Sequence, residues 1–181
     1  THCSFFQLLP SAPLSDRLEA ANSPQTMTSS PSRTVLERCI FCKIVTGQDP
    51  NASIVYQNER ICIFKDIRPA AEQHLLAVPK YHLDDVRSLT SAERPLLEEM
   101  RKELGNVLKD QFQIDPAEAL FGFHVPPFTT VKHLHMHGMG PVGSMGFLSR
   151  MIFRPNSMWF NTDQAVLSRI PAVSHDETGS Q

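Results

Sequence analysis

Three histidines alternate with two apolar residues in the segment His133-Leu134-His135-Met136-His137. Side chains of an extended strand alternate between its two faces, so the three imidazoles should line one face while Leu134 and Met136 enter the core. Two chemistries use such a row. Imidazole is a common ligand of zinc and copper, and a neutral imidazole can also attack phosphorus and form a covalent intermediate. The spacing by itself leaves both open.

The flanking residues favour phosphorus chemistry. Thr129 and Thr130, just upstream, offer hydroxyl groups to a phosphate oxygen, and Gly138 and Gly140 let the backbone approach a ligand closely. The immediate sequence neighbourhood holds no carboxylate, which a catalytic metal site often includes. A histidine nucleophile also suits physiological conditions, because the imidazole pKa lies near neutrality.

A second candidate cluster begins at Cys39 and Cys42, whose Cys-x-x-Cys spacing lets two thiolates grip one ion. A structural zinc needs four ligands, so this pair supplies half of a site. Two buried thiols or a redox pair are the alternatives. We expect no disulfides, since a chain with 41% hydrophobic residues can build a core without them. Cys3 and Cys62 then have no expected role.

The composition is that of a globular domain with small-molecule partners. Charged residues make up 20% of the chain and the net charge is −2, which argues against the broad basic surface that nucleic acid requires. No run approaches the roughly 18 apolar residues of a membrane helix, and the N-terminus lacks a convincing signal peptide. We therefore expect no membrane association and a cytoplasmic location, with the nucleus as a further one.

Three regions follow one another along the chain. Residues 1–34 are rich in Pro, Ser and Thr and predict a disordered N-terminal tail. Residues 35–146 carry the periodic apolar patterns of a folded domain, and the motifs described above all lie within it. Residues 147–181 form an aromatic extension and tail.

The folded domain has the pattern of an α+β fold. A short N-terminal helix is expected over 35–45, and a long helix follows Thr90, where Thr90 and Glu93 have the spacing of a capping box. Strand patterns occupy five segments, namely 54–56, 61–64, 74–78, 119–123 and 131–138. Antiparallel strands with one long helix between the third and the fourth predict a five-stranded antiparallel sheet.

Four blocks, in order along the chain, resemble the histidine triad (HIT) family. They are Cys39–Ile44, Ile63–Ile67, His74–His82 and the triad segment His133–Met139, and the resemblance covers residues 38–142. Gly138 departs from the family pattern, which usually has a bulky apolar residue there, and Gly122 stands near the place of an asparagine that many relatives carry. The stretch Leu120–Phe128 is similar to the aprataxin-related branch. The resemblance implies a HIT-like fold.

The resemblance also implies an activity, the hydrolysis of adenosine 5'-monophosphoramidate to AMP and ammonia or an amine. In this interpretation His135 becomes adenylylated, His137 hydrogen-bonds the phosphate, Thr130 lies near the leaving group, and His133 completes the triad. Asp66 holds the ribose hydroxyls, and an Asx turn is the alternative role for it. The residues implied around the base are Ile67, Phe41, Ile44, Phe64 and Met136. For the two phenylalanines and Ile44, core packing is the alternative.

Family members with the cysteine pair bind zinc, so the resemblance implies that His82 and His133 join Cys39 and Cys42 around a structural zinc. Such an ion would tie the N-terminal helix to the sheet, and catalysis itself would need no cofactor. The implied partners are a purine nucleotide substrate and a second copy of the chain in a homodimer. Three alternatives stay open: a nucleotide-binding scaffold with little turnover, an aprataxin-like removal of AMP from nucleic acid ends, and a metal-dependent enzyme built on the histidines.

Overall fold

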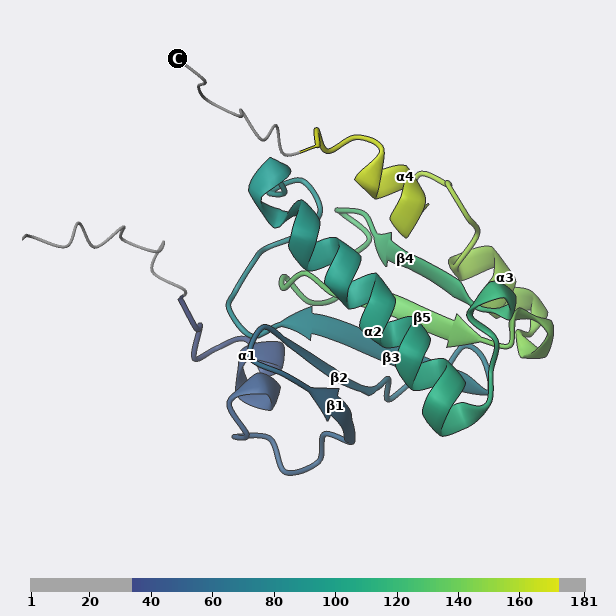
Figure 1. The fold of residues 1–181 in the computed structure, drawn as a ribbon, viewed down its shortest axis with the longest axis horizontal. Coiled ribbons are helices and arrows are strands. Elements are labelled where there is room, and N and C mark those ends of the chain that lie inside the picture. The colour runs from purple at the N-terminus through teal and green to yellow at the C-terminus, as the bar shows by residue number, and fades with distance from the viewer. Residues whose placement is uncertain (1–33, 173–181) are drawn as a thin grey trace, which may run out of the picture. The chain divides into compact units, whose positions relative to one another are not determined.

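The computed structural model describes residues 34–172, and their helices and strands have the α+β arrangement that the sequence predicts (Figure 1). The elements are α1 (Ile40–Val45), β1 (Ile54–Gln57), β2 (Ile61–Lys65), β3 (Gln73–Pro79), α2 (Arg94–Phe112), β4 (Leu120–His124), β5 (Met136–Gly140), α3 (Phe147–Ile152), β6 (Phe160–Thr162) and α4 (Asp163–Leu167). Short 3-10 helices lie at Ser91–Glu93, Pro116–Glu118 and Val142–Ser144. The expected disordered tail, apart from Thr34, lies outside the described residues.

Within residues 34–172, six strands form one antiparallel sheet in the order β1-β2-β3-β5-β4-β6. The prediction of five strands is therefore wrong by one. The additional strand, β6, comes from the aromatic segment after residue 146 and pairs with β4. It has three residues, too few for a period-2 pattern to stand out in the sequence. Its place in the sheet comes from tertiary packing, since Phe160 and Asn161 are both buried.

The strand register sorts the side chains onto two faces. Ile63, Ala77 and Met136 are Cα partners across β2, β3 and β5. Leu76 and His137 are partners one position along, and therefore face the opposite way. The long helix α2 lies across the first face (Figure 1), and the main hydrophobic core fills the space between them. The triad histidine of β5 thus belongs to the face away from α2.

The predicted capping box is present, at the start of the 3-10 helix Ser91–Glu93 that leads directly into α2. The backbone N–H of Thr90 donates to Glu93 Oε2 at 2.8 Å, which completes the capping box. The apolar stripe is buried against the sheet along its length, through Leu96, Leu97, Met100, Leu104, Val107 and Leu108.

The two glycines of β5 leave space for side chains that pack on the α2 side of the sheet. A Cβ on Gly138 would lie 3.1 Å from Leu104 Cδ2, and one on Gly140 would lie 2.8 Å from Ile114 Cγ2. Either contact is closer than ordinary van der Waals packing allows. The expectation that these glycines let the backbone approach a ligand is therefore wrong. They let neighbouring core side chains approach the strand.

Two smaller clusters cover the other face. Beside α1, the buried residues are Phe41, Ile44, Cys62, Phe64, Leu76 and Val78. Beside α3 and β6, they are Ala70, Met139, Met145, Phe153 and Phe160. The rings of His135 and His137 touch members of both clusters, since Phe41 contacts His135 and Phe153 contacts His137. The histidines therefore occupy the seam between the two clusters.

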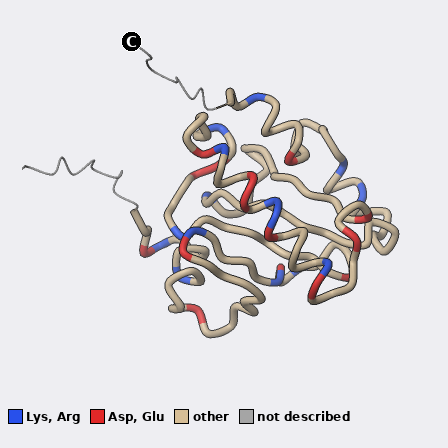
Figure 2. Tube along the Cα trace, in the orientation of Figure 1, with Lys and Arg blue, Asp and Glu red and all other residues tan. Residues whose placement is uncertain are grey.

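Charged residues of both signs are interspersed along α2 (Figure 2). The exposed side of α2 therefore carries no long run of a single charge sign. Among residues 34–172, no helix has both the length and the apolar character that crossing a bilayer demands.

Candidate active site

The three histidines of the triad are all buried, with exposed fractions of 0% for His133, 7% for His135 and 4% for His137. Leu134 and Met136 enter the main core, as the alternation predicts. The predicted strand over 131–138 is partly wrong, because β5 begins only at Met136. The preceding residues bond elsewhere, and the N–H of Leu134 donates to the carbonyl of Leu83 at 2.6 Å. Only His137 is therefore held by the sheet itself.

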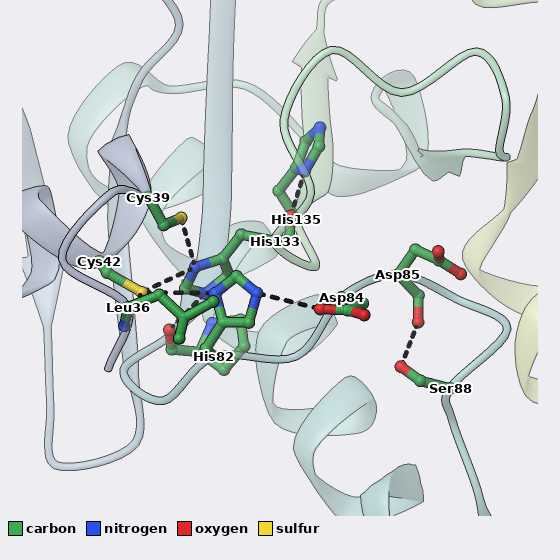
Figure 3. Close-up of polar contacts among 10 residues, drawn as sticks. Leu36, Cys39, Cys42, His82, Asp84, Asp85, Ser88, His133 and His135 are labelled. Carbon is green, nitrogen blue, oxygen red and sulfur yellow. Dashed lines mark hydrogen bonds and ion pairs between the residues drawn. The ribbon is translucent and has the colours of Figure 1, made fainter. Parts of the chain in front are cut away.

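His135 is positioned with one ring nitrogen free. Its Nδ1 lies 2.6 Å from the carbonyl oxygen of His133, and a carbonyl oxygen can only accept (Figure 3). Nδ1 is thus the donor, and the lone pair of the neutral ring lies on Nε2. Burial lowers the pKa of His135, and the hydrogen bond to the carbonyl opposes that shift only in part. The result is a neutral imidazole whose Nε2 can act as a nucleophile.

A chain of hydrogen bonds fixes the opposite tautomer in His137. The N–H of Ala70 donates to His74 Nδ1 at 3.2 Å, so the proton of the neutral His74 ring lies on Nε2. That Nε2 lies 2.8 Å from His137 Nδ1, to which it donates. The neutral His137 ring then carries its proton on Nε2. This nitrogen is buried without a hydrogen-bond partner among the described residues.

Burial is the main reason that the pKa of His137 is well below its ordinary value, and the neighbouring His135, His74 and His124 lower it further. The pKa of His74 is also lowered by burial, against the attraction of Asp66. Both rings are therefore neutral at pH 7, as the hydrogen-bond chain requires. A buried N–H without an acceptor costs free energy, and an anionic ligand at this point would satisfy it.

Asp66 lies beside this chain. Its Oδ2 is 3.6 Å from His74 Nε2, while its Oδ1 accepts the N–H of Arg68 at 2.7 Å. The second contact is the Asx turn that the sequence allowed as an alternative. Since the turn uses one oxygen, the other remains directed toward the histidines. Asp66, His74 and His137 also lie close enough for a metal ion, but the facing nitrogens of the two rings are already hydrogen-bonded to each other.

Aromatic rings close the other side of His137. The ring centroids of His124 and Phe153 lie 5.1 and 5.3 Å from that of His137. His124 Nδ1 lies 3.1 Å from the carbonyl oxygen of Trp159, so it donates there and leaves Nε2 as the acceptor. No role for His124 was predicted from the sequence. The signal that could have found it is the register of β4, since Gly122 pairs with His137 and His124 lies on the same face two residues on.

Gly122 explains how the aromatic extension joins the site. A Cβ at this position would lie 2.4 Å from the carbonyl oxygen of Asn161 and 2.6 Å from Phe160 Cζ. Position 122 therefore accommodates no side chain while β6 is in place. The space beside His137 is filled by the ring of Phe160, at 6.1 Å between centroids.

The cysteine pair meets two histidines as the resemblance implied, and the four side chains converge in Figure 3. Cys39 Sγ and Cys42 Sγ lie 3.4 and 3.5 Å from His133 Nδ1, and Cys42 Sγ lies 3.4 Å from His82 Nδ1. Tetrahedral zinc with ordinary bond lengths gives sulfur–nitrogen separations of about 3.6 Å. The four ligand atoms, all within 4.8 Å of one another, therefore fit a zinc ion.

The outer nitrogens of these two histidines are also held. His82 Nε2 donates to Asp84 Oδ1 at 3.1 Å, and His133 Nε2 donates to the carbonyl oxygen of Pro79 at 3.0 Å. Each Nδ1 lone pair consequently faces the sulfurs, as a ligand's must. Burial and the nearby histidines lower the pKa of His133 to about 4, so its ring is neutral. Burial raises the pKa of the Cys42 thiol, whereas the N–H of Leu36 at 3.3 Å from the sulfur favours the thiolate.

Comparisons with known proteins agree with this arrangement. Residues 38–152 match the family model described as "Scavenger mRNA decapping enzyme C-term binding". The chain is 38% identical over 134 residues to a Xenopus tropicalis protein named adenosine 5'-monophosphoramidase HINT3, which covers 74% of this chain and 88% of that relative. The Mus musculus protein of the same name is 37% identical over 133 residues, or 73% and 81% of the two chains. The chain belongs to the HIT family.

A solved HIT structure has the same fold. It is the HIT family hydrolase from Clostridium thermocellum, which matches with a TM-score of 0.54 and 34% sequence identity over 58% of this chain and 91% of that chain. The resemblance found in the sequence is therefore confirmed for both family and fold. The two HINT3 relatives are named as adenosine 5'-monophosphoramidases.

Four of the five residues implied around the base are buried in this HIT domain, and the fifth is exposed. Phe41, Ile44 and Phe64 pack into the cluster beside α1, which is the core-packing alternative. Of the three, Phe41 contacts a triad ring, with its centroid 5.2 Å from that of His135. Ile67 is 92% exposed. Met136 requires a correction, because its side chain is fully buried in the core on the α2 side and is not available to a nucleotide.

A crevice of about 10 Å³ opens beside His135 and is lined by Thr129, His124 and Asp85. Thr130, which the resemblance placed near the leaving group, is exposed and does not line this crevice. Thr129 is the hydroxyl residue that the structure brings to His135. The sequence named both threonines but had no means to choose, because the bend between β4 and β5 decides which side chain turns inward.

Proposed function

We propose that this protein hydrolyses adenosine 5'-monophosphoramidate and related nucleoside phosphoramidates to AMP and ammonia or an amine through a covalent His135–AMP intermediate. The observation that carries the proposal is the opposite tautomers of two adjacent rings. His135 offers a lone pair on Nε2, and His137 offers an unpartnered N–H on Nε2. Nucleophilic displacement at phosphorus needs one of each, a nucleophile and a donor to the phosphate oxygens. The names of the HINT3 relatives support the choice of substrate.

In the proposed reaction, His135 Nε2 attacks phosphorus and forms a P–N bond. The original P–N bond breaks, and its electron pair leaves with the amine nitrogen, which takes up a proton from solvent water. Water then attacks phosphorus in the cationic His135–AMP adduct, the P–N bond to His135 breaks, and AMP, the neutral ring and a proton released to solvent result. The N–H of His137 donates to a non-bridging phosphate oxygen, where negative charge accumulates in both steps. Asp66, with one carboxylate oxygen outside its Asx turn, is proposed to hold the ribose hydroxyls.

Turnover of adenosine 5'-monophosphoramidate tests the proposal, with His135→Ala as the decisive variant and excess EDTA as a second arm. We expect AMP release by the full chain to survive EDTA and to be abolished in the variant. Mass spectrometry after a rapid denaturing quench should find an acid-labile AMP group on His135. Nucleotide binding without AMP release would instead establish a scaffold. Activity lost to EDTA and restored by added metal would establish a metal-dependent enzyme, provided that circular dichroism shows the chain to stay folded in EDTA.

We propose a structural role for zinc held by Cys39, Cys42, His82 and His133. When bound, the ion supplies a rigid link between α1 and the residues that lead into β5. No catalytic step is assigned to it, because the Nε2 atom of His135 lies outside the ligand set. Metal analysis of the purified chain tests occupancy directly, and the absence of stoichiometric zinc under reducing conditions would refute the assignment. A homodimer is a further proposal, for which light scattering after size exclusion gives the answer.

A further inference from the structure

A cavity of about 310 Å³ lies on the opposite face of the sheet from the triad side chains. Its apolar walls are aliphatic and come from Val86, Leu89, Val125, Val166 and Ile170. Its volume lies at the lower end of the range for small-molecule sites, about 300 to 1,000 Å³. The cavity and the crevice beside His135 share one wall residue, Val86, so they are neighbours.

One polar side chain faces this cavity from within the sheet. Asn161 of β6 is 7% exposed, and its amide makes no hydrogen bond with any described residue. It pairs with Phe123 of β4, whose ring belongs to the core on the α2 side, so the amide points to that side of the sheet. Its amide atoms are not among the buried polar atoms without a partner, so water reaches them and they are available to a polar group of a ligand. Asn161 therefore marks this cavity as a site that accepts a polar group.

Two arginines add positive charge to the lining. Arg87 and Arg169 both line the cavity and are exposed, and neither forms an ion pair with a carboxylate of the described residues. The guanidinium of Arg87 donates to the carbonyl of Pro126, which leaves its other N–H groups available. The nearby Asp85 accepts the backbone N–H of Arg87 and lines the crevice instead of this cavity.

The walls of the cavity are held in place by contacts that a ligand need not disturb. The guanidinium of Arg94 in α2 donates to the carbonyl oxygens of Leu167 and Ile170 at 2.9 and 2.8 Å. Arg101 forms an ion pair with Asp163 at 3.1 Å, which fixes the start of α4. The cavity is thus preformed, and binding would require little reorganisation of the chain.

We propose that this cavity binds a small ligand that has an aliphatic body and a single anionic group, such as an alkyl carboxylate. The aliphatic walls would bury the body, Asn161 would donate to an oxygen of the anionic group, and Arg87 and Arg169 would neutralise its charge. The apolar part of the lining is aliphatic and offers no aromatic ring on which a base could stack, which separates this site from the proposed nucleotide site. The inference does not depend on the proposed hydrolytic activity.

Octanoate is the probe, and octylammonium is the matched cation with the same chain length. In two-dimensional ¹H–¹⁵N spectra of the full chain, octanoate should shift the Asn161 side-chain amide, identified by its disappearance in Asn161→Asp. We expect this variant to bind octanoate about tenfold more weakly, because a donor to a charged group is replaced by a like charge. Arg169→Gln, an exposed change that leaves the core intact, should weaken binding about threefold. Arg154→Gln, an exposed arginine outside the cavity, is the charge-matched control and should have no effect.

Three results would overturn the inference. Octylammonium could bind as tightly as octanoate, which would remove the role of the arginines. Octanoate could shift only the exposed apolar residues of α3, namely Phe147, Leu148, Met151 and Ile152, which would mean non-specific adsorption. Alternatively, Leu89→Trp, designed to fill the cavity from its loop side, could leave octanoate affinity unchanged while the chain stays folded by circular dichroism.

Discussion

Two groups of histidines lie side by side on the same face of the sheet and are prepared for different chemistry. In the group around the cysteines, His82 and His133 each donate from Nε2 to an acceptor, so both Nδ1 lone pairs face the two sulfurs. In the group around the phosphate position, His135 presents a lone pair and His137 presents an N–H. The difference arises from what each ring's other nitrogen contacts. Identical side chains thereby become metal ligands in one place and a nucleophile with its donor in the other.

The largest effect is expected when the imidazole of His135 is removed from the catalytic group. We expect His135→Ala to lower the rate of phosphoramidate hydrolysis at least about a thousandfold, because the nucleophile is lost. Zinc content and the denaturation midpoint should stay close to those of the parent chain, since His135 makes its hydrogen bond to the backbone of His133 alone. Steady-state kinetics and metal analysis of the same sample make the test. Substantial residual turnover would show that His135 is not the nucleophile.

The reciprocal change removes a ligand from the other group. Cys42→Ser should abolish stoichiometric zinc and lower the free energy of unfolding by at least about 2 kcal/mol, because a buried metal link between α1 and the sheet is lost. Denaturant titrations with and without added zinc measure this effect. Cys62→Ser is the matched control, as Cys62 is equally buried but is not one of the ligand atoms. If both variants lose the same stability, the effect comes from packing alone.

A smaller effect is expected from the residue that orients His137. His74→Phe keeps a ring of similar shape but cannot donate to His137 Nδ1, so the Nε2 proton of His137 is no longer fixed. We expect a 10- to 100-fold loss in kcat with a modest change in KM, the size typical of partners that orient a functional histidine. His74→Gln offers an amide N–H near the same place and should recover part of the rate. Equal activities of the two variants would contradict the hydrogen-bond chain.

The smallest effect should come from Asp84, whose carboxylate accepts a hydrogen bond from the proposed zinc ligand His82. Asp84→Asn weakens the hydrogen bond that holds His82 Nε2, and we expect zinc affinity to fall about tenfold while hydrolysis is unchanged. Competition with a chromophoric chelator measures the affinity. Asp85→Asn, at the next residue and without contact to His82, serves as the control for the lost charge. A fall in hydrolysis that matched the fall in zinc affinity would mean that the two groups are coupled.

Local patterns predicted most of the sheet and the long helix, since the alternation of the strands and the stripe of α2 both reflect contact with one core. The predicted helix over 35–45 begins only at Ile40. Its first apolar residues, Val35 and Leu36, are 43% and 42% exposed, and the backbone of Leu36 bonds to Cys42 instead. The apolar residues at positions 35 and 36 thus matched a helical spacing although they are not buried. Residues around a cluster of polar ligands do not follow the periodicity of a core-facing helix.

The sequence by itself determined which residues are available: three alternating histidines, a spaced cysteine pair and four ordered blocks that identify the family. The chemical role of each of these residues depends on contacts that form only in the folded domain. The contact between Cys39 and His133 spans 94 positions, and β6 reaches Gly122 from 38 residues downstream. A histidine's chemistry depends on which nitrogen keeps its lone pair, and that depends on donors and acceptors brought from distant segments. Spacing along a strand carries no information about those partners.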